Sequence, residues 1–592
     1  MSKRLILILA LAFVVGISFA AYAEVQNVKV SGDLTVKAVY RNNFDLTKPA
    51  TEGPVLPPAA GAVIMRPVVD PSTWNDKEQD FLSITRVRVD ADLTDNVATT
   101  VRLINERNWG ESTQTVTGRN NVNVGLGSRN PLIGAAFVPN AIGVANTRAD
   151  ENGVDIDLAY VTLKEFLYSP LTLTIGRQEL HFGNDWIVGD PDTNGIALDT
   201  ALAEGDLSAR KSFDAVRATM DYKPLVIDTV YAKVSEGDVT RDDDLTLSGI
   251  NAAYELNKET NLEGFFFSKV KGAGNAAVRN IDVANGGVAA VGTNANQYYD
   301  SARQDMFKDK ADVVNTVGGR VVNKSIKNLT IDLSSAFQFG TYNPKFDPNA
   351  RVFDSRPGNP LTKAETSQRR AWGLEAIATY DLSEIQKIAK YKPSISGAYV
   401  YLSGEDRYKT GDDTYRGWDP MFENQTFGHI INAIMGFSNV QLAGLSMQAK
   451  PVEDVGVKLD WVTAYLNKRY ADADRMNWPA GFAGNGGMPT VASLSGIPTA
   501  NEFNMGKTSF LGQEIDATVT YDYTEDVQFS LLGGIFLPGK SINEQPQTMS
   551  YSAPVAGMPA GGWGGGGPNG GTRTLQNRAA AVELIGSMKV TF

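Results

Sequence analysis

The segment EIDATVTYDY, residues 514–523, alternates between polar and apolar side chains without a break. Successive side chains of a β-strand point to opposite faces, so Ile515, Ala517, Val519, Tyr521 and Tyr523 share one face, and acidic or hydroxylated side chains share the other. Acidic side chains at successive positions of a dry core would be costly. The segment is therefore typical of a transmembrane barrel strand, with one face toward lipid and the other toward a water-filled lumen.

The same alternation recurs along the chain, for example in RVRVDADL at 86–93 and IDLSSAFQF at 331–339. It predicts about 18 strands, an even number, as bacterial single-chain barrels require. The predicted strands are residues 25–41, 80–94, 97–109, 152–166, 171–180, 212–222, 225–235, 244–256, 261–271, 315–325, 329–342, 369–382, 393–404, 440–450, 455–468, 509–523, 527–537 and 577–592.

Short and long connections alternate between these strands. Tight turns, such as 95–96 and 222–224, alternate with long segments rich in Gly, Pro, Asn and Asp. Outer-membrane barrels have short periplasmic turns and long external loops. The sequence therefore predicts an all-β fold, a transmembrane antiparallel up-and-down β-barrel, in which the irregular turn 383–392 holds a helical turn. The long connections are residues 42–79, 110–151, 181–211, 272–314, 343–368, 405–439, 469–508 and 538–576.

The N-terminus has the anatomy of a secretory signal peptide. Lys3 and Arg4 precede the apolar stretch 5–16, and residues 21–23 (Ala-Tyr-Ala) form a small-x-small cleavage site. The apolar stretch is shorter than the ~20 residues of a spanning helix, which disfavours an uncleaved anchor. We expect residues 1–23 to be removed and residues 24–592 to form the barrel as a single domain. No plug domain is expected, because strand-like sequence begins within a few residues of Glu24.

The C-terminal strand also alternates, and it ends on the aromatic residue Phe592. Such an ending resembles the segment that the outer-membrane insertion machinery reads. A soluble protein that happens to end in a strand is the alternative, and the signal peptide argues against it. The expected location is the bacterial outer membrane, where the partners are membrane lipid, lipopolysaccharide and the insertion machinery.

Composition excludes several classes of function. Hydrophobic residues make up 42% of the chain, and loss of the two basic residues of the signal peptide changes the formal net charge from −12 to −14. Without a basic surface, nucleic-acid binding is not expected. The absence of cysteine excludes disulfides and thiolate metal sites. His181 and His429 are the only histidines, so we expect no metal site and no cofactor.

Three stretches resemble the alginate export family of outer-membrane β-barrel porins. They are LTIGRQEL at 173–180 followed by GNDWIVGD at 183–190, RKSFDAVR at 210–217, and LGQEID at 511–516. The resemblance implies a barrel of about 18 strands and an arginine-rich constriction that passes an anionic polysaccharide. The sequence departs from this pattern in that inward acids accompany the inward bases. The matching motif residues are Gly176, Arg177, Gln178, Asp190, Phe213 and Asp214.

Charged residues on the inward faces are the candidate functional residues, because charge rings set selectivity in such pores. The arginines could form a basic ladder for carboxylates or phosphates. Alternatively, they pair with neighbouring carboxylates as structural networks of the lumen, and a mixture of both roles is favoured. The candidate pore-lining residues are Arg86, Arg88, Asp90, Asp92, Arg102, Arg177, Arg217, Glu514 and Asp516.

Arg177 breaks the pattern, because strict alternation from Ile175 would aim it at lipid. An arginine on that face at the membrane midplane costs roughly 2–4 kcal/mol. We therefore expect either a bulge at Gly176 that turns Arg177 inward or a position near the loop rim. The first reading makes Arg177 a pore-lining charge, and the second makes it a rim residue held by the following loop.

The sequence gives little support for a metal site or a catalytic site. Residues 190–195 (Asp-Pro-Asp-Thr-Asn-Gly) open like a calcium loop, but the position that an EF-hand fills with Glu is Ala201. The acidic run 242–244 is typical of a solvated loop tip. No nucleophile motif or Ser/His/Asp set is present, so the protein is not expected to be an enzyme.

We expect an outer-membrane channel for passive passage of a small polar or anionic solute or a polysaccharide. A general porin of low selectivity is the second hypothesis, with 110–151 or 272–314 as the loop folded into the lumen. A barrel that only displays its loops for surface binding is the third. An open basic constriction would favour the first, an open mixed one the second, and a lumen packed shut the third.

Overall fold

The computed structural model describes residues 27–44, 46, 77–109, 153–168, 170–191, 205–236, 244–272, 311–342, 367–404, 414–468, 508–543, 547–550, 572–575 and 579–592. The predicted signal peptide and much of the long connections lie outside these residues, as do residues 192–195 of the calcium-like loop.

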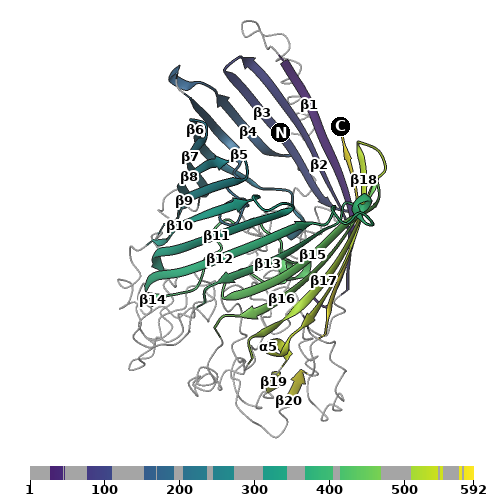
Figure 1. Cartoon of the computed structure of the whole chain (residues 1–592). Coiled ribbons are helices and arrows are strands. Elements are labelled where there is room, and N and C mark those ends of the chain that lie inside the picture. Colours follow the sequence, from purple (N-terminus) through teal and green to yellow (C-terminus); the bar gives the residue numbers. More distant parts are fainter. Residues whose placement is uncertain are drawn as a thin grey trace, which may run out of the picture.

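Eighteen antiparallel strands form one closed barrel, because β1 pairs with β2 on one side and with β21 on the other (Figure 1). This confirms the predicted fold class and strand number. The strands are β1 (Asn27–Asn42), β2 (Lys77–Thr94), β3 (Val97–Asn108), β4 (Asp155–Leu163), β5 (Leu171–Glu179), β6 (Ser212–Asp221), β7 (Leu225–Ser235), β8 (Leu245–Asn257), β9 (Thr260–Lys271), β10 (Asp312–Asn323), β11 (Leu329–Tyr342), β12 (Ser367–Asp381), β13 (Ser394–Leu402), β15 (Val440–Val452), β16 (Val455–Leu466), β17 (Phe510–Asp522), β18 (Val527–Pro538) and β21 (Ala581–Thr591).

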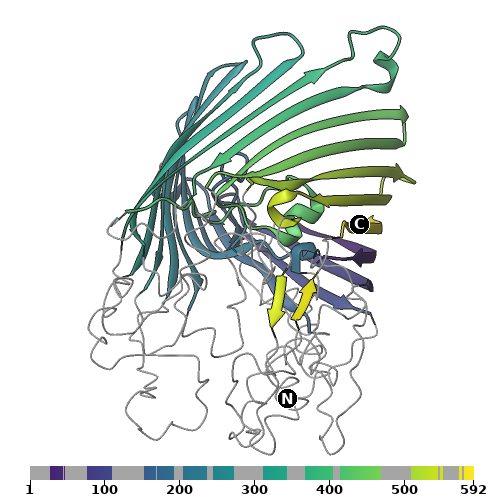
Figure 2. The same ribbon diagram turned by 90° about the horizontal axis from the view of Figure 1, so that it is seen from below.

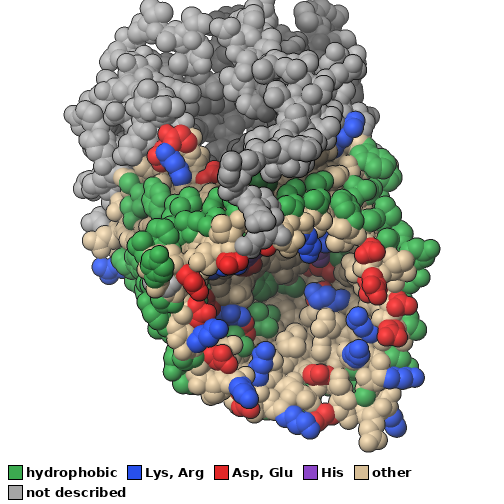
Figure 3. Space-filling model, turned by 90° about the horizontal axis from the view of Figure 1, so that it is seen from above, with side chains coloured by type: hydrophobic (Ala, Val, Ile, Leu, Met, Phe, Trp, Pro, Cys, Tyr) green, Lys and Arg blue, Asp and Glu red, His purple; other side chains and the backbone are tan. Residues whose placement is uncertain are grey.

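Burial along the strands follows the predicted alternation. On β17, Ile515 is 41% exposed and Tyr521 44%, whereas Glu514 and Asp516 are 0% and 1% exposed. Hydrophobic side chains gather on the outer surface, and a hollow beside them is lined with intermixed basic and acidic side chains (Figure 3). The apolar face of the wall thus points outward, and the polar face points into the lumen.

Short pieces of structure accompany the barrel. The turn 383–392 contains the 3-10 helix η9 (Ala389–Tyr391), as predicted, while strands β14 (Thr414–Tyr415), β19 (Gln547–Ser550) and β20 (Thr572–Leu575) were not predicted. Along the stretches that the structure describes, no helix has the length and apolar character needed to span a membrane. The remaining helices are η5 (Phe166–Tyr168), η6 (Gly205–Leu207), α3 (His429–Ile434) and α5 (Lys540–Asn543).

The bulge expected at Gly176 is not there, since β5 and β6 pair in continuous register from Leu171 to Glu179. Gly176 instead adopts a φ of 125°, where a Cβ would lie 2.2 Å from the Ala159 carbonyl oxygen. The bulge lies on the other side of β4, where the pairing with β3 shifts and both Asp157 and Leu158 are buried. An extra residue in β4 lets Asp157 turn inward beside Leu158.

The two ends of the chain meet at the seam between β1 and β21. The Phe592 N–H donates to the Gly32 carbonyl oxygen at 3.0 Å, and the Gly32 N–H donates to the Phe592 carbonyl oxygen at 2.8 Å. A Cβ at position 32 would lie 2.6 Å from the Phe592 ring. Phe592 therefore extends the ladder that closes the barrel, and its reading by the insertion machinery stays a prediction.

Candidate functional site

Two connections fold into the lumen and are hydrogen-bonded to each other. Residues 180–191 and residues 414–439, which we call the clasp, run side by side at Val188 and Phe422. The Gly189 N–H donates to the Phe422 carbonyl oxygen at 2.7 Å, and the Phe422 N–H donates to the Ile187 carbonyl oxygen at 3.0 Å. The predicted inward loops 110–151 and 272–314 lie almost entirely outside the described residues, whereas the clasp lies within them and occupies part of the lumen.

The clasp is attached to the wall by apolar packing. Its buried side chains form one cluster with inward-facing residues near the long-loop ends of many strands. Trp186 stacks on Trp418 with ring centroids 5.5 Å apart, and Phe213 meets Phe422 edge to face at 5.8 Å. Water is therefore excluded between the clasp and this part of the wall. The inner wall is apolar here, where strand alternation alone predicts polar residues.

Helix α3 of the clasp is held by two residues from the predicted pore-lining set. Glu514 accepts hydrogen bonds from the Ile430 and Ile431 N–H groups, both at 2.7 Å, and Asp516 accepts one from the His429 N–H at 3.3 Å. Figure 2 shows α3 inside the ring of strands. The first N–H groups of a helix have no partner within the helix, so these carboxylates satisfy them. In this structure Glu514 and Asp516 anchor the clasp.

The connection from β5 to β6 rejoins the wall near the seam between β1 and β21. Its last part, residues 205–211, which we call the return arm, packs beside an apolar cluster from β1, β2, β3, β18 and β21. Glu106 on β3 is fully buried and accepts hydrogen bonds from the Ser208 Oγ at 3.1 Å, the Ala209 N–H at 2.7 Å and the Arg210 Nε at 2.9 Å. The connection 180–211 is therefore fixed to the wall at two separate places.

Each predicted arginine of the ladder other than Arg177 faces a carboxylate on the inner wall. The pairing partners come from the same or a neighbouring strand, apart from Glu179, which is a second partner of Arg102. Asp92 lies near the short-turn end of β2 with an exposed side chain. The arginine–carboxylate pairs of the ladder are Arg86–Asp33 at 2.9 Å, Arg88–Asp90 at 2.8 Å, Arg102–Asp157 at 2.6 Å and Arg217–Asp228 at 2.8 Å.

Arg177 pairs across the strands with Asp214, at 3.3 Å. Asp214 shares a face of β6 with the outward-facing Val216, and its side chain is 62% exposed. Both residues lie within three positions of the long-loop end of their strands. This placement corresponds to the rim position, the second of the two alternatives for Arg177.

The other family-motif residues attach the clasp to β5 and β6. The Gln178 side-chain amide donates to the Ala215 carbonyl oxygen at 3.0 Å and reaches two carbonyl groups of its own strand. Asp190 is fully buried and pairs with Lys211. Phe213 packs on the clasp as described above. The motif residues thus lie where the β5–β6 connection leaves and rejoins the wall.

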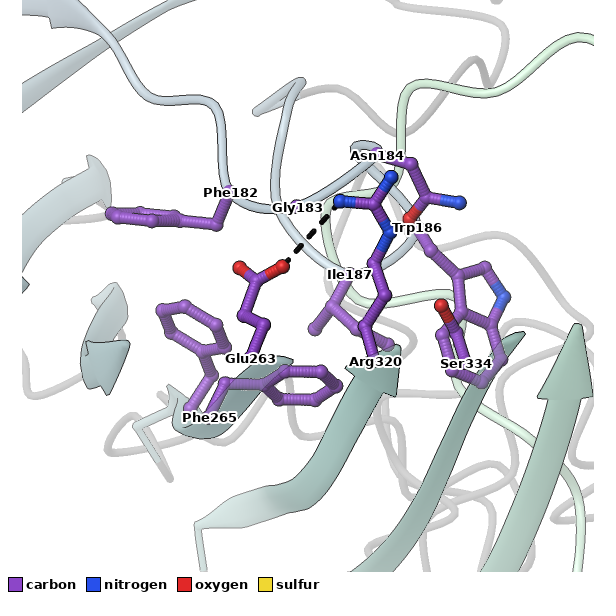
Figure 4. Close-up of a pocket in the computed structure, with 10 residues that line it drawn as sticks. Phe182, Gly183, Asn184, Trp186, Ile187, Glu263, Phe265, Arg320 and Ser334 are labelled. Atoms are coloured by element: carbon purple, nitrogen blue, oxygen red, sulfur yellow. Dashed lines mark ion pairs between the residues drawn. The ribbon is translucent and has the colours of Figure 1, made fainter. Parts of the chain in front are cut away.

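A row of four inward polar residues lies below the clasp, and three of them, Glu263, Arg320 and Glu375, were not predicted individually. Glu263, Arg320, Ser334 and Glu375 are direct neighbours across β9, β10, β11 and β12. Arg320 lies 3.6 Å from Glu263, and both side chains face the tip of the clasp at Asn184 and Trp186 (Figure 4). The alternation of the strands could have located these residues, because it places each of them inward.

Two titratable groups of the clasp have shifted pKa values. Burial alone would favour the neutral form of Asp419, but Lys269, whose Nζ lies 2.6 Å away, and Arg369 hold the pKa of Asp419 below its usual range. A hydrogen bond with Asp185, at 3.0 Å, raises the pKa of His181. Both contacts favour the charged forms of these groups. The first joins the clasp to β9, and the second joins two residues within the clasp.

The site has no recognisable catalytic or metal centre among its described residues. His181 faces Asp185, and His429 begins α3, so the two histidines belong to different segments of the clasp. No three His, Cys, Asp or Glu side chains within the described ranges gather as metal ligands. The arrangement offers a wall of paired charges and a constriction.

The family comparison identifies the chain. The family model for alginate export matches residues 72–555. No curated protein matches the sequence. Among solved structures, the chain is similar to OccK3 (OpdO) of Pseudomonas aeruginosa, at 8% identity, covering 96% of this chain and 97% of that one with a TM-score of 0.42. It is also similar to a BenF-like porin from Pseudomonas fluorescens Pf-5, at 9% identity, covering 96% and 100% with a TM-score of 0.43. The chain belongs to the alginate export family and is an outer-membrane channel for solute passage.

Proposed function

We propose that the channel passes polar solutes passively, and that its charged wall admits anionic solutes, including polysaccharides. The observation that supports this is the set of inward arginine–carboxylate pairs. A solute carboxylate can exchange places with a wall carboxylate at a guanidinium, while sugar hydroxyl groups can bond to either partner. Arg88 carries most of this argument, because its side chain is 36% exposed although it is paired.

The pore-lining roles of the predicted residues are part of this proposal. Arg86, Arg88 and Asp90 would contact the passing solute, because their side chains are partly exposed on the inner wall. Arg217, which lies over the Phe182 ring of the clasp, would contact it beside the clasp. Arg102 would act mainly on the return-arm side, next to Asp157. Arg177 would serve at the outer rim beside Asp214 rather than inside the pore.

A general porin of low selectivity is the second candidate, and one observation favours it. Each of the four inward arginines of the predicted ladder already has a carboxylate within 3 Å. A paired guanidinium attracts a solute anion less than a free one, because the field of the neighbouring carboxylate opposes it. Such a wall would pass small polar solutes of either charge.

We further propose that the protein carries out no catalysis and is secreted with removal of residues 1–23. Membrane lipid and lipopolysaccharide would contact the outer apolar face, and the insertion machinery would read the strand that ends at Phe592. The apolar outer positions of β17 and the exposed C-terminal aromatic side chain support these partners.

Single-channel conductance in a planar bilayer, with the reversal potential measured under a salt gradient, tests the proposal. We expect steady current, and block by an anionic oligosaccharide would support the anionic reading. Steady current without charge selectivity or block would favour the general porin. If the correctly folded protein gives no current, both channel mechanisms proposed here are wrong. Arg88→Gln should reduce any anion preference, with the exposed periplasmic-turn variant Lys327→Gln as the control.

A further inference from the structure

Glu375 is an inward-facing carboxylate in the middle of β12. It is 1% exposed, and its direct neighbours across the sheet are Ser334 on β11 and Val400 on β13. The cation nearest in this part of the wall, Arg320, is engaged by Asp332, with an Nη2–Oδ2 distance of 2.6 Å. The wall therefore supplies Glu375 with no salt-bridge partner of its own among the described residues.

The clasp supplies its partners instead. The Asn184 side-chain amide donates to Oε1 of Glu375, and the Gln425 side chain also interacts with this carboxylate. The two amides come from different segments of the clasp, since Asn184 lies in 180–191 and Gln425 lies in 414–439. Gln425 also donates to the Asn184 carbonyl oxygen at 3.3 Å. One wall carboxylate thus contacts both segments where they approach the lumen.

These contacts lie at the tip of the clasp, a few residues along the chain from its other attachments. Glu514 and Asp516 hold α3, and the apolar cluster holds the segments near the long-loop ends. Near the tip, Gly183 lies close to Glu263, and Trp186 lies against the wall at Gly373. Glu375 is the residue here whose side chain joins both segments by polar contacts.

We propose that Glu375 is a positioning residue that holds the tip of the clasp against the wall and so sets the size limit of the channel. The inference about size rests on the proposed passage of polar solutes. If the carboxylate is removed, the Asn184 amide loses its buried acceptor and the Gln425 side chain loses a polar neighbour, and exchange with water becomes favourable for both. The tip then moves away from β12 part of the time, and larger solutes pass.

The test uses the full protein reconstituted in liposomes, with swelling rates measured in sugars of increasing size. Glu375→Ala should raise the rate for a trisaccharide, relative to that for a monosaccharide, several-fold. Glu375→Gln keeps one carbonyl acceptor and should restore a limit close to that of the unmodified protein. Asn184→Ala should give a smaller increase, and adding it to Glu375→Ala should change little further. Asp332→Asn is the matched control, because it removes a neighbouring wall carboxylate whose partner is Arg320.

Hydrogen exchange provides a second readout that needs no solute. In Glu375→Ala, the Gly189 and Phe422 amides should exchange several-fold faster, because their hydrogen bonds join the two segments. Unchanged exchange and an unchanged size limit in a folded variant would overturn the positioning role. A protein that passes no sugar would refute the proposed function and the size-limit role together, whereas the exchange rates would still decide whether Glu375 holds the clasp. An equal effect of Asp332→Asn would also overturn the proposal.

Discussion

The seam that closes the barrel depends on a buried arginine, and replacing it tests how the wall is stabilised. Arg41 on β1 lies 2.7 Å from Glu583 on β21 and 2.6 Å from Asp206 of the return arm. Arg41 and Glu583 are both almost fully buried. Arg41→Ala would therefore leave the Glu583 carboxylate buried without its hydrogen-bonded cation, at the place where the first and last strands pair.

The expected loss follows from the cost of leaving a buried charge unpaired. Removing one partner of a buried ion pair costs about 3–5 kcal/mol. Lys37 carries a second positive charge close enough to interact with Glu583 and Asp206. We therefore expect the free energy of unfolding of Arg41→Ala to fall by about 3 kcal/mol, the lower end of that range.

Urea unfolding in lipid vesicles, followed by tryptophan fluorescence, would measure this change. A double-mutant cycle separates the pair from the loss of packing. Because Glu583→Ala leaves Arg41 with Asp206, it should cost less than Arg41→Ala, and the double variant should be more stable than Arg41→Ala alone. The reasoning would be refuted if Arg41→Ala stayed within about 0.5 kcal/mol of the unmodified protein, or if the two substitutions were simply additive.

Three further predictions concern the β5–β6 connection. Gly176→Ala should lower the yield of folded barrel, judged by heat-modifiable migration on gels, because it adds about 1–3 kcal/mol of backbone strain besides a clash with β4; normal folding would contradict this. Histidine NMR titration should give His181 a pKa above its usual value, and Asp185→Asn should lower it. Since the folded pKa is the raised one, the contact stabilises the clasp below about pH 6.5 and this contribution is lost as the pH rises through the folded pKa. Glu106→Gln should speed hydrogen exchange in the return arm by roughly 10-fold or more, for a loss of about 1.5–3 kcal/mol, and unchanged exchange would show that Glu106 does not hold the arm.

The strands could be predicted because each carries its own signal. The segment 514–523 alternates over its whole length, and the structure places all of it except Tyr523 in β17, with the predicted faces outward and inward. The pairing order also follows from sequence, because neighbouring strands in an up-and-down barrel are consecutive. Local periodicity therefore determines most of the wall without reference to distant residues.

The partners of the inward charges could not be predicted in the same way. Arg41 and Glu583 are 542 positions apart, and only closure of the barrel brings them together. Glu514 and Asp516 were placed inward correctly by alternation, but their partners are backbone N–H groups of a helix more than 80 residues away in sequence. Periodicity gives the direction of a side chain, whereas the contact depends on which loop folds over it.

Breaks in the alternation carry information that strict periodicity discards. Residues 265–267 are three consecutive phenylalanines, of which Phe266 faces outward and Phe267 is fully buried under the clasp. Phe536 on β18 is likewise fully buried between the exposed Ile535 and Leu537. An apolar side chain that faces a water-filled lumen stays exposed to water and does not stabilise the fold. It is stabilising only where another apolar surface covers it. Strand segments that are apolar on both faces should therefore mark where loops dock inside a wide barrel, whereas inward charges alone do not, since Glu106, Glu375 and Glu514 are buried beneath such loops.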